Sequence, residues 1–346
     1  MKASLFLASA MAATGLAAPS TSPNVAKRAD VTTDELSKLH YWAEQAGTAY
    51  CNSNNAAGTP VACSNRVCPT VAGDKAVTIA SFTGYTTDIR GLVSVDPVKK
   101  VIAVSFRGSS SVQNWMADEN FVQVPCDLVS GCLVHAGFYT AWKEVATKVT
   151  AAVQSAHATN PDYSIGVTGH SLGAAVATLA AAYLRKAGYT ADLITFGSPR
   201  VGNEAFVAFV TNQPGDEYRV THASDPVPRV PPIYDNYRHT SPEWWINTES
   251  TQPTTSQVKI CEGYANIQCN AGTLSYNIAD HLNYFGSIGG CLVGGRGFGW
   301  KRDDTNVAAS NVTDEELETR VKQWTAEDVA YVKSNNLETD LKALVL

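Results

Sequence analysis

Hydrophobic residues along this chain follow two different periods, and the segments with each period alternate. A helical spacing of three and four residues, with Leu36, Leu39 and Trp42 on one face, predicts a helix over residues 30–50. The same spacing, set by residues such as Phe138 and Trp142, predicts a second helix over residues 137–157. Strands are expected where β-branched and aromatic residues cluster, at residues 77–82, 90–95, 100–106, 163–167, 191–196 and 217–221.

The order of these segments predicts an α/β fold. The first three strands follow one another closely, with a turn at Asp96-Pro97, and are expected to form an antiparallel meander. The later strands are separated by helices, including those expected over residues 174–184 and 204–211. Strands that alternate with helices pair in parallel through right-handed crossovers, so the central sheet should be mostly parallel.

The most informative stretch is Gly169-His170-Ser171-Leu172-Gly173, which reads Gly-x-Ser-x-Gly. It lies between a predicted strand and an alanine-rich predicted helix. In that context a serine is held on a strained turn with its hydroxyl exposed, next to the N–H groups at the start of the helix. Ser171 is therefore the expected nucleophile. The alternative is an ordinary serine in a glycine-rich turn.

The strand over residues 101–106 ends at a second polar loop. In enzymes with a serine nucleophile, one oxyanion donor is the N–H of the residue after the nucleophile, and the other lies in a loop after an earlier strand. Leu172 and Ser109 occupy those positions and are the expected oxyanion hole. Taken alone, the loop at Ser109 is more typical of a plain strand end.

Residues 111–121 predict a short amphipathic helix containing Trp115 and Met116. Such a helix can act as a lid that covers the site in water and turns outward at a lipid surface. The pattern alone favours a simpler interpretation, in which Trp115 anchors a small surface helix by packing.

The acid of a catalytic triad is expected after Ser171 and at the carboxyl end of a strand, because the order in this type of fold is Ser, Asp or Glu, His. Asp225 meets both conditions, since it follows the strand over residues 217–221. Asp235 has no strand before it and is the reserve candidate.

Two histidines lie late enough in the chain to be the base, His239 and His281. His281 follows a long loop that can reach back over the strand ends, so its position favours it. His239 precedes a segment that reads as a packed strand and is expected to be structural. Asp280, beside His281, is interpreted as a helix cap.

Composition places the chain among globular proteins: of 346 residues, 45% are hydrophobic and 17% charged. The net charge of −6 gives no indication of nucleic-acid binding.

Residues 1–18 have the basic flank, apolar stretch and small residues of a secretory signal, and residues 19–28 end in Lys27-Arg28, which is typical of a propeptide. No later apolar run is long enough to span a bilayer. We therefore expect a secreted protein whose catalytic domain covers residues 29–302.

Eight cysteines in a secreted chain suggest disulfides. Six of them form pairs that are close in sequence, which leaves two distant ones to join the ends of the domain; the pairs are Cys63 with Cys68, Cys126 with Cys132, Cys261 with Cys269, and Cys51 with Cys291. Sequence does not prove this pairing. A zinc site is the alternative, but the chain has no Cys-x-x-Cys pair.

The tail over residues 303–346 differs in character from the rest, because its acidic excess accounts for the whole formal charge. It follows a second dibasic pair, Lys301-Arg302, and contains Asn311, which begins a glycosylation sequon. Thr313 and Glu316 predict a capped helix, and Val329 and Val332 a second helix. We interpret the tail as a C-terminal propeptide; the alternative is a permanently attached pair of surface helices.

Several motifs together resemble the secreted class 3 lipases of filamentous fungi, especially the lipase/phospholipase A1 enzymes of Fusarium. The resemblance covers about Val31 to Gly295. It is carried, in family order, by residues 104–109, 114–115, 134–138, 168–173, 197–203, 225–232, 239–243 and 281–285.

The resemblance implies an α/β-hydrolase-like fold with helices on both faces of the sheet, and hydrolysis of triacylglycerols and of phospholipids at sn-1. It implies Ser171, Asp225 and His281 as the triad, Ser109 and Leu172 as the oxyanion hole, and Trp115 in the lid. The partner would be a lipid–water interface, with no metal or other cofactor. The small and acidic residues 117–119 depart from more apolar family lids.

Two other functions stay open from the sequence. A feruloyl-type esterase acting on plant-wall esters shares this fold, and Trp115 and Met116 favour lipid without deciding the matter. A non-enzymatic lipid-binding protein on a lipase fold is the second alternative, and a complete set of Ser171, Asp225 and His281 argues against it.

Overall fold

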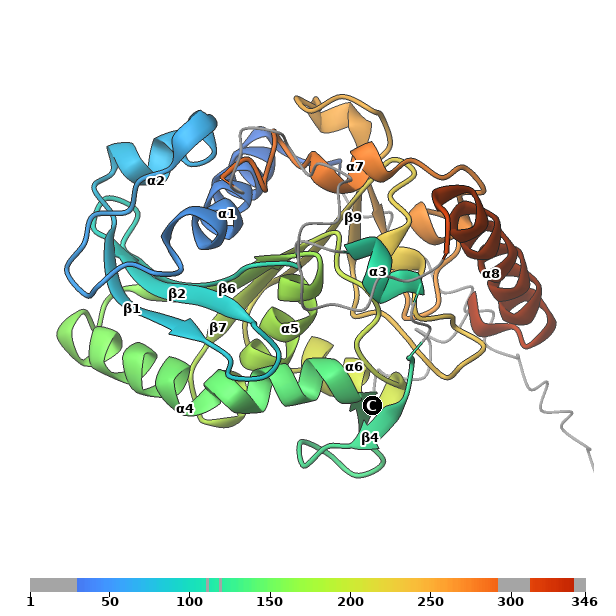
Figure 1. The fold of residues 1–346 in the computed structure, drawn as a ribbon, viewed down its shortest axis with the longest axis horizontal. Helices are drawn as coiled ribbons and strands as arrows, with labels where there is room; N and C mark the ends of the chain where they lie inside the picture. Colours follow the sequence, from blue (N-terminus) through green and yellow to red (C-terminus); the bar gives the residue numbers. More distant parts are fainter. Residues whose placement is uncertain (1–29, 110–111, 118–119, 292–311, 339–346) are drawn as a thin grey trace, which may run out of the picture.

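The computed structural model describes residues 30–109, 112–117, 120–291 and 312–338, and its centre is an eight-stranded sheet (Figure 1). The strand order is β1-β2-β3-β6-β7-β8-β9-β10. The strands are β1 (Val77–Thr83), β2 (Arg90–Asp96), β3 (Val101–Phe106), β6 (Ser164–His170), β7 (Ala191–Phe196), β8 (Glu217–His222), β9 (Glu243–Ile246) and β10 (Val258–Cys261). A small second sheet pairs β4 (Gln123–Pro125) with β5 (Leu133–His135).

The pairing confirms a mostly parallel sheet with an antiparallel N-terminal meander. Strands β1, β2 and β3 pair antiparallel, and β3 through β9 pair in parallel in the order given. At the far edge β10 turns back antiparallel to β9. Because β3, β6, β7 and β8 are parallel, their carboxyl ends meet along one edge of the sheet, where the expected site residues also lie.

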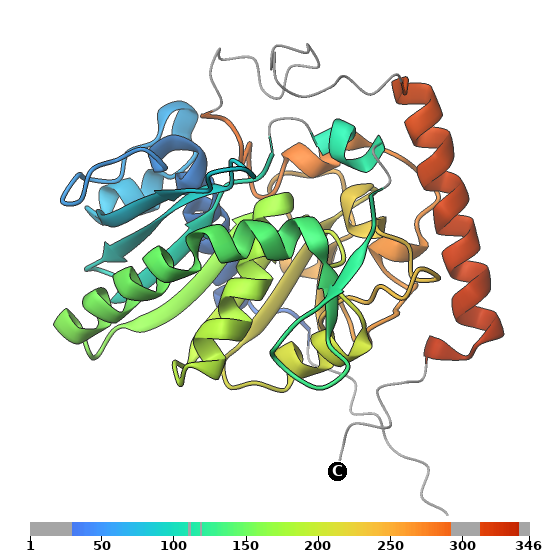
Figure 2. The ribbon, with the colours of Figure 1, turned by 60° about the horizontal axis from the view of Figure 1, so that its bottom comes forward.

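Helices cover both faces of the sheet (Figures 1 and 2). They are α1 (Thr33–Asn52), α2 (Pro69–Gly73), α3 (Val112–Ala117), α4 (Ala136–Thr159), α5 (Leu172–Lys186), α6 (Glu204–Thr211), α7 (Ile278–Leu282) and α8 (Asp314–Ser334). Short 3₁₀ turns occur at η1 (Ser64–Arg66), η2 (Val227–Arg229), η3 (Thr255–Gln257) and η4 (Asn270–Gly272).

Each face has its own hydrophobic core. On one face α4 and α5 pack over the strands with Phe138, Trp142 and Leu179 fully or almost fully buried. On the other, Trp42 of α1 lies directly on β6, where a Cβ at Gly166 would come within 1.9 Å of the indole ring. The helices therefore clamp the strands from both sides.

Two helix ends differ from expectation. Helix α1 begins at Thr33 and ends at Asn52, whereas the sequence predicts residues 30–50; Thr32 caps it, in a capping box with Glu35. The expected second tail helix is wrong: Val329 and Val332 belong to the single continuous helix α8. The helix is continuous because residues 314–334 contain no glycine or proline that would end it.

Several expectations lie outside the described residues: the signal segment and propeptide before Asp30, Asp118 and Glu119, Lys301-Arg302, and Asn311. Within the described ranges, no helix is both long and apolar enough to cross a membrane.

Candidate active site

Ser171 lies at the turn that joins β6 to α5. Its φ of 61° and ψ of −134° are values that side-chain-bearing residues rarely adopt. The turn also requires close backbone contacts: a Cβ at Gly169 would lie 2.5 Å from the carbonyl oxygen of Gly173. The N–H of Ser171 donates to the carbonyl of Phe196 on β7 at 2.9 Å. Strand, turn and helix thus hold the serine at the carboxyl edge of the sheet, as the sequence predicts.

The structure brings His281 and Asp225 together. His281 lies in α7, and its Nδ1 is 2.9 Å from Oδ2 and 3.1 Å from Oδ1 of Asp225, which follows β8. Both side chains are fully buried. With Nδ1–H donating to the carboxylate, the neutral ring has Nε2 free to accept a proton. Within the described part of the chain, neither Nε2 of His281 nor Oγ of Ser171 has a hydrogen-bond partner.

The carboxylate of Asp225 is held in its ionised form. Tyr284 donates its hydroxyl to Oδ2 at 2.5 Å, and the N–H of Val227 donates to Oδ1 at 2.9 Å. Burial raises the pKa of Asp225, but the charge of His281 and these hydrogen bonds outweigh it and hold the pKa below its usual value. An ionised acid at this position stabilises the histidine when it becomes positively charged.

A chain of hydrogen bonds links the loop before Ser109 to the main chain of His281. The N–H of Gly108 donates to the hydroxyl of Tyr50 at 3.1 Å, which lies 2.7 Å from Nδ1 of His170. Nε2 of His170 lies 2.8 Å from the carbonyl of His281. Burial, with the charge of neighbouring His281, lowers the pKa of His170 to about 3. A neutral ring with its proton on Nε2 satisfies every contact in the chain.

Sequence reasoning missed Tyr50, His170 and Tyr284. His170 lies inside the nucleophile motif but precedes Ser171, so the expected order of the triad gives it no role, and Tyr284 lies three residues after His281. Tyr50 gave no sequence signal, because it reaches the site from the end of α1, which is remote in the chain.

The expected oxyanion positions flank the nucleophile. Leu172 is the first residue of α5, next to Ser171. Ser109 follows Gly108, where a Cβ would lie 2.9 Å from the Cβ of Ser171. Backbone N–H groups at such positions can stabilise the negative oxygen of a tetrahedral intermediate.

Helix α3 follows β3 at the same edge. Trp115 is partly buried, and its ring lies 5.6 Å from that of Phe138 and 6.2 Å from that of His135. Met116 is completely buried. Trp115 is thus a packing anchor in this arrangement, and at the same edge of the sheet Ser171 is only 1% exposed.

The remaining candidates have other partners. His239 is buried, and its Nε2 lies 2.7 Å from the carbonyl of Pro228. The expectation that Asp280 caps a helix is wrong: Asn277 caps α7, and Asp280 instead accepts from the N–H of Ser224 at 2.9 Å. Asn277 is the cap because it is the last residue with extended backbone before the helix, whereas Asp280 lies within the helix.

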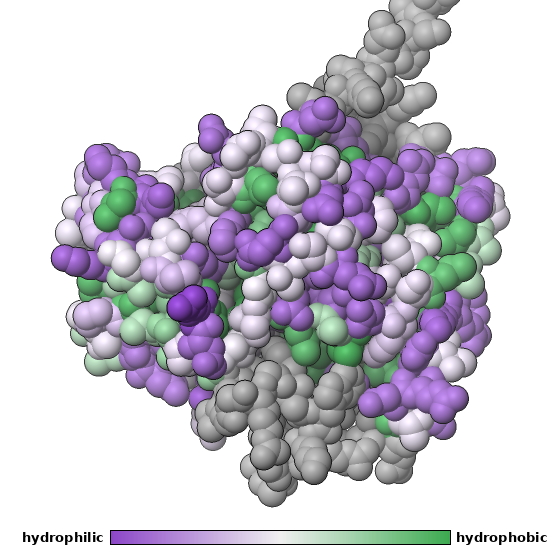
Figure 3. Space-filling view, turned by 90° about the horizontal axis from the view of Figure 1, so that it is seen from above, coloured by the Kyte–Doolittle hydropathy of each residue, from purple (hydrophilic) through white to green (hydrophobic). Residues whose placement is uncertain are grey.

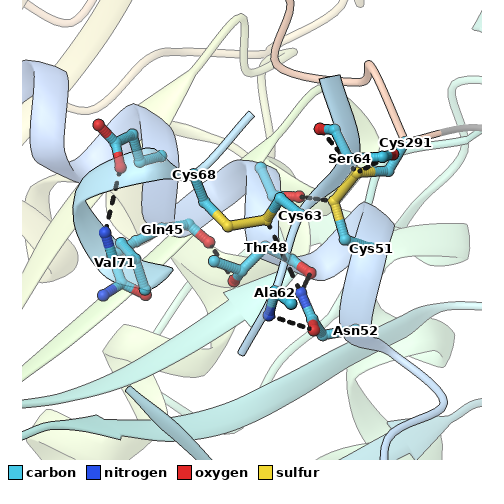
Figure 4. Close-up of a disulfide and its surroundings, with 12 residues drawn as sticks. Gln45, Thr48, Cys51, Asn52, Ala62, Cys63, Ser64, Cys68, Val71 and Cys291 are labelled. Atoms are coloured by element: carbon cyan, nitrogen blue, oxygen red, sulfur yellow. Dashed lines mark hydrogen bonds between the residues drawn. A yellow bond between two sulfur atoms is a disulfide. The ribbon is translucent and has the colours of Figure 1, made fainter. Parts of the chain in front are cut away.

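The structure contains four disulfides between the pairs considered from the sequence. Figure 4 shows Cys51–Cys291 beside Cys63–Cys68. The sulfur atoms of Cys51, Cys63 and Cys291 lie within 4.8 Å of one another, but all three are in disulfides, which lack the thiolate that a metal needs.

The chain matches a known family over this region. Residues 103–235 match the family model of lipase (class 3). The chain is similar to secreted mono- and diacylglycerol lipase 1 of Fusarium solani, with 48% identity over 88% of this chain and 89% of that protein. It is also similar to secreted mono- and diacylglycerol lipase A of Penicillium cyclopium, with 39% identity over 82% and 95%.

Solved structures agree with this similarity. The crystal structure of mono- and diacylglycerol lipase from Aspergillus oryzae superposes with a TM-score of 0.72 and 38% identity, over 75% of this chain and 99% of that chain. From the family match, these relatives and the shared α/β-hydrolase-like fold, the chain belongs to the class 3 lipases, a family of ester hydrolases.

Proposed function

We propose that the chain is a secreted lipase that hydrolyses acylglycerols through an acyl-enzyme on Ser171. The observation that carries the proposal is the buried contact of 2.9 Å between His281 and Asp225, at the edge of the sheet where Ser171 is held. The similarity to proteins named secreted mono- and diacylglycerol lipases supports acylglycerols as the substrate class, and the lipase family supports triacylglycerols among them.

In the proposed reaction, Nε2 of His281 takes the proton of Ser171 while Oγ attacks the ester carbonyl. The N–H groups of Ser109 and Leu172 stabilise the tetrahedral oxyanion. Collapse of this intermediate releases the glyceride alcohol, which receives the proton from His281, and leaves the fatty acyl group on Ser171. His281 then removes a proton from water, which attacks the acyl-enzyme and releases the fatty acid.

Within this mechanism α3 is a lid, because it lies at the site edge and Trp115 and Met116 turn inward. At a lipid surface the same apolar side chains would face the lipid instead of the protein.

Substitution of the acid tests the triad. Asp225→Asn should lower kcat by roughly three to four orders of magnitude, because an amide does not hold the histidine in the required tautomer. Ser171→Ala should abolish turnover while the fold persists. Asp235→Asn is the matched control, since it makes the same change at the reserve candidate. Equal losses in Asp225→Asn and Asp235→Asn, or more than trace activity in Ser171→Ala, would overturn the assignment.

We propose hydrolysis of phospholipids at sn-1 as a second activity. The resemblance of its motifs to those of Fusarium lipase/phospholipase A1 enzymes supports it. Fatty-acid release should be compared on emulsions of mono-, di- and triacylglycerol and on phosphatidylcholine vesicles. Release from all the acylglycerols but none from phosphatidylcholine would restrict the enzyme to glycerides.

We also propose maturation by removal of residues 1–18, 19–28 and 303–346, with a glycan on Asn311 before the tail is lost. The signal-like pattern and the Lys-Arg pairs Lys27-Arg28 and Lys301-Arg302 support it. Mass spectrometry of the secreted protein should find Ala29 at the N-terminus, and an intact Leu346 would argue against removal of the tail.

A further inference from the structure

Helix α8 lies along one side of the molecule, away from the sheet-covering helices, and its N-terminal end is next to α3 (Figures 1 and 2). Its buried residues fall on one face at helical spacing: Leu317, Val321, Thr325, Asp328 and Val332. The half-exposed polar pair Glu318 and Lys322 lies beside this face. The buried face is what attaches the helix to the rest of the protein.

The first half of this face packs on the lid helix. A buried cluster joins α3, the segment after Asp225 and α8, and we call it the lid cluster. Its members are Val112, Met116, Ala117, Val227, Val230, Leu317 and Val321. At its margin the ring of Trp324 lies 5.8 Å from that of Phe121. Gln113 donates to Asp314 at 3.0 Å. The apolar side of α3 is therefore buried against α8 and is not available to a lipid surface.

The face of the molecule seen from above agrees with this. Among the described residues it shows small hydrophobic groups interspersed with hydrophilic ones (Figure 3). A large apolar area is what a lipid surface requires, whereas the buried apolar residues of α3 pack in one cluster with Leu317 and Val321 of α8.

The second half of α8 carries a carboxylate that is buried in a polar cradle. One oxygen of Asp328 accepts from Nη1 of Arg200 at 2.9 Å, and the other accepts from the N–H of Ile233 at 2.6 Å and of Tyr234 at 3.3 Å. Arg200 and Asp328 are both 1% exposed. A buried pair of this kind is costly to break by removing one partner, because the other charge stays buried. Asp328 therefore fixes the position of α8 along the domain.

The tail is nevertheless separate from the architecture of the domain. Cys291 closes the domain through its disulfide with Cys51, and α8 comes after that closure. Both sheets are formed by strands between Val77 and Cys261, and α8 follows them in the chain. The hydrophobic cores on the two faces of the sheet contain no residue of α8.

We propose that α8 is an autoinhibitory latch, which holds α3 closed over Ser171 and is locked by the insertion of Asp328 between Arg200 and the N–H groups of Ile233 and Tyr234. Release of α8, by cutting of the chain before it, frees α3 to open. The proposal rests on the proposed function, since it takes Ser171 as the nucleophile and α3 as its lid.

The test measures how fast a bulky p-nitrophenyl alkylphosphonate reacts with Ser171 of the full chain, in solution without lipid. Asp328→Asn removes the charge from the cradle, and Leu317→Gln weakens the contact with α3. Each should raise the rate constant at least about fivefold, because each shifts the population toward the open lid. Glu315→Gln makes the same charge change on the exposed side of α8 and should react like the unchanged chain.

A second arm does not depend on how the variants fold. The folded chain from Ala29 to Leu346 is cut by a protease specific for Lys-Arg pairs, of which it contains only Lys301-Arg302, and the helix is separated by dilution. The reaction with phosphonate should then be faster than before the cut. A synthetic peptide of residues 303–346 should restore the slow rate, whereas the same peptide with Asp328→Asn should not.

The outcomes separate the two proposals. If intact, variant and cut chains all react at one measurable rate, α8 is not a latch. If no form reacts, even after the cut, Ser171 is not the nucleophile and the proposed function fails. Slow reaction of the intact chain, faster reaction of the cut chain and reversal by the unchanged peptide alone would establish the latch.

Discussion

Ser171, the proposed nucleophile, has an unfavourable backbone conformation. Its φ of 61° belongs to the region that glycine adopts readily and other residues avoid. The surrounding strand and helix impose the conformation, because the N–H of Ser171 is bonded to β7 and α5 begins at the next residue. The position thus retains a serine at some expense in stability, as is common at functional sites.

This strain predicts that glycine at position 171 is more stable than alanine. Ser171→Gly and Ser171→Ala should both abolish hydrolysis, but the glycine variant should be more stable by about 1 kcal/mol, because it adopts the positive φ without a Cβ. Urea unfolding of the two inactive variants measures the difference directly. Equal stabilities, or a more stable alanine variant, would contradict the strain argument.

The hydrogen bonds around the triad also belong to the residue scale. Tyr284 donates its hydroxyl to the carboxylate of Asp225. Nε2 of His170 lies at hydrogen-bond distance from the main-chain carbonyl of His281. These two contacts position the acid and the base of the proposed triad. Side chains of these two types suit the task because each can donate a hydrogen bond while buried and neutral. The triad is therefore held from several elements at once.

Among the elements, α4 has an unusual start. Its N-cap is His135, whose Nδ1 accepts from the N–H of Gly137 at 3.1 Å and lies 3.4 Å from the N–H of Phe138. Only the neutral ring can accept in this way. Burial lowers the pKa of His135 to about 4, so it remains neutral in the folded protein when an unfolded histidine has already taken up a proton.

The cap predicts how stability depends on pH. Below the unfolded pKa of about 6.5 the unfolded chain binds a proton that folded His135 does not, so stability falls as the pH falls toward 4. At pH 5 the loss from this residue should be about 2 kcal/mol. His135→Asn keeps a capping oxygen but does not titrate, and should make the loss of stability between pH 7 and 5 less steep.

Urea unfolding at several pH values checks this prediction, with His40→Asn as the matched change at an exposed histidine. A profile for His135→Asn that runs parallel to that of the unchanged protein would mean that the cap does not couple to pH.

For the whole molecule, the disulfide between Cys51 and Cys291 sets the covalent limits of the domain. It joins residues 240 positions apart, from the end of α1 to the last residue described before the tail. Cross-linking such distant residues restricts the unfolded chain far more than a local bridge does. The tail lies outside the closed loop, which is why α8 can be considered as a separable part.

Loop length predicts a ranking of the disulfides. Replacing both Cys51 and Cys291 by serine should cost about 5 kcal/mol of unfolding free energy in the chain-entropy model, whereas the same change at Cys63 and Cys68, which are 5 positions apart, should cost about 2 kcal/mol. Denaturant unfolding of the two double variants gives the comparison. A larger loss at the short bridge would show that native packing, and not loop closure, dominates.

The sequence by itself determined the parts of this protein that depend on neighbours in the chain. The order of strands and helices, the turn at Ser171 and the acid at the end of a strand follow from periodicity and local backbone chemistry, which act over a few residues. Asp225 and His281 could be selected because the fold type orders them after Ser171, and the structure places them 2.9 Å apart.

The tertiary structure alone decided what depends on contacts between distant segments. Tyr50 reaches His170 across 120 positions, and Arg200 reaches Asp328 across 128. The sequence also left the tail without a position. Its described residues, 312–338, contain the single helix α8, whose apolar face packs partly on α3. Local pattern shows that a face is apolar or a carboxylate is present, but its partner is chosen by how the whole chain packs, because only packing brings such groups within reach.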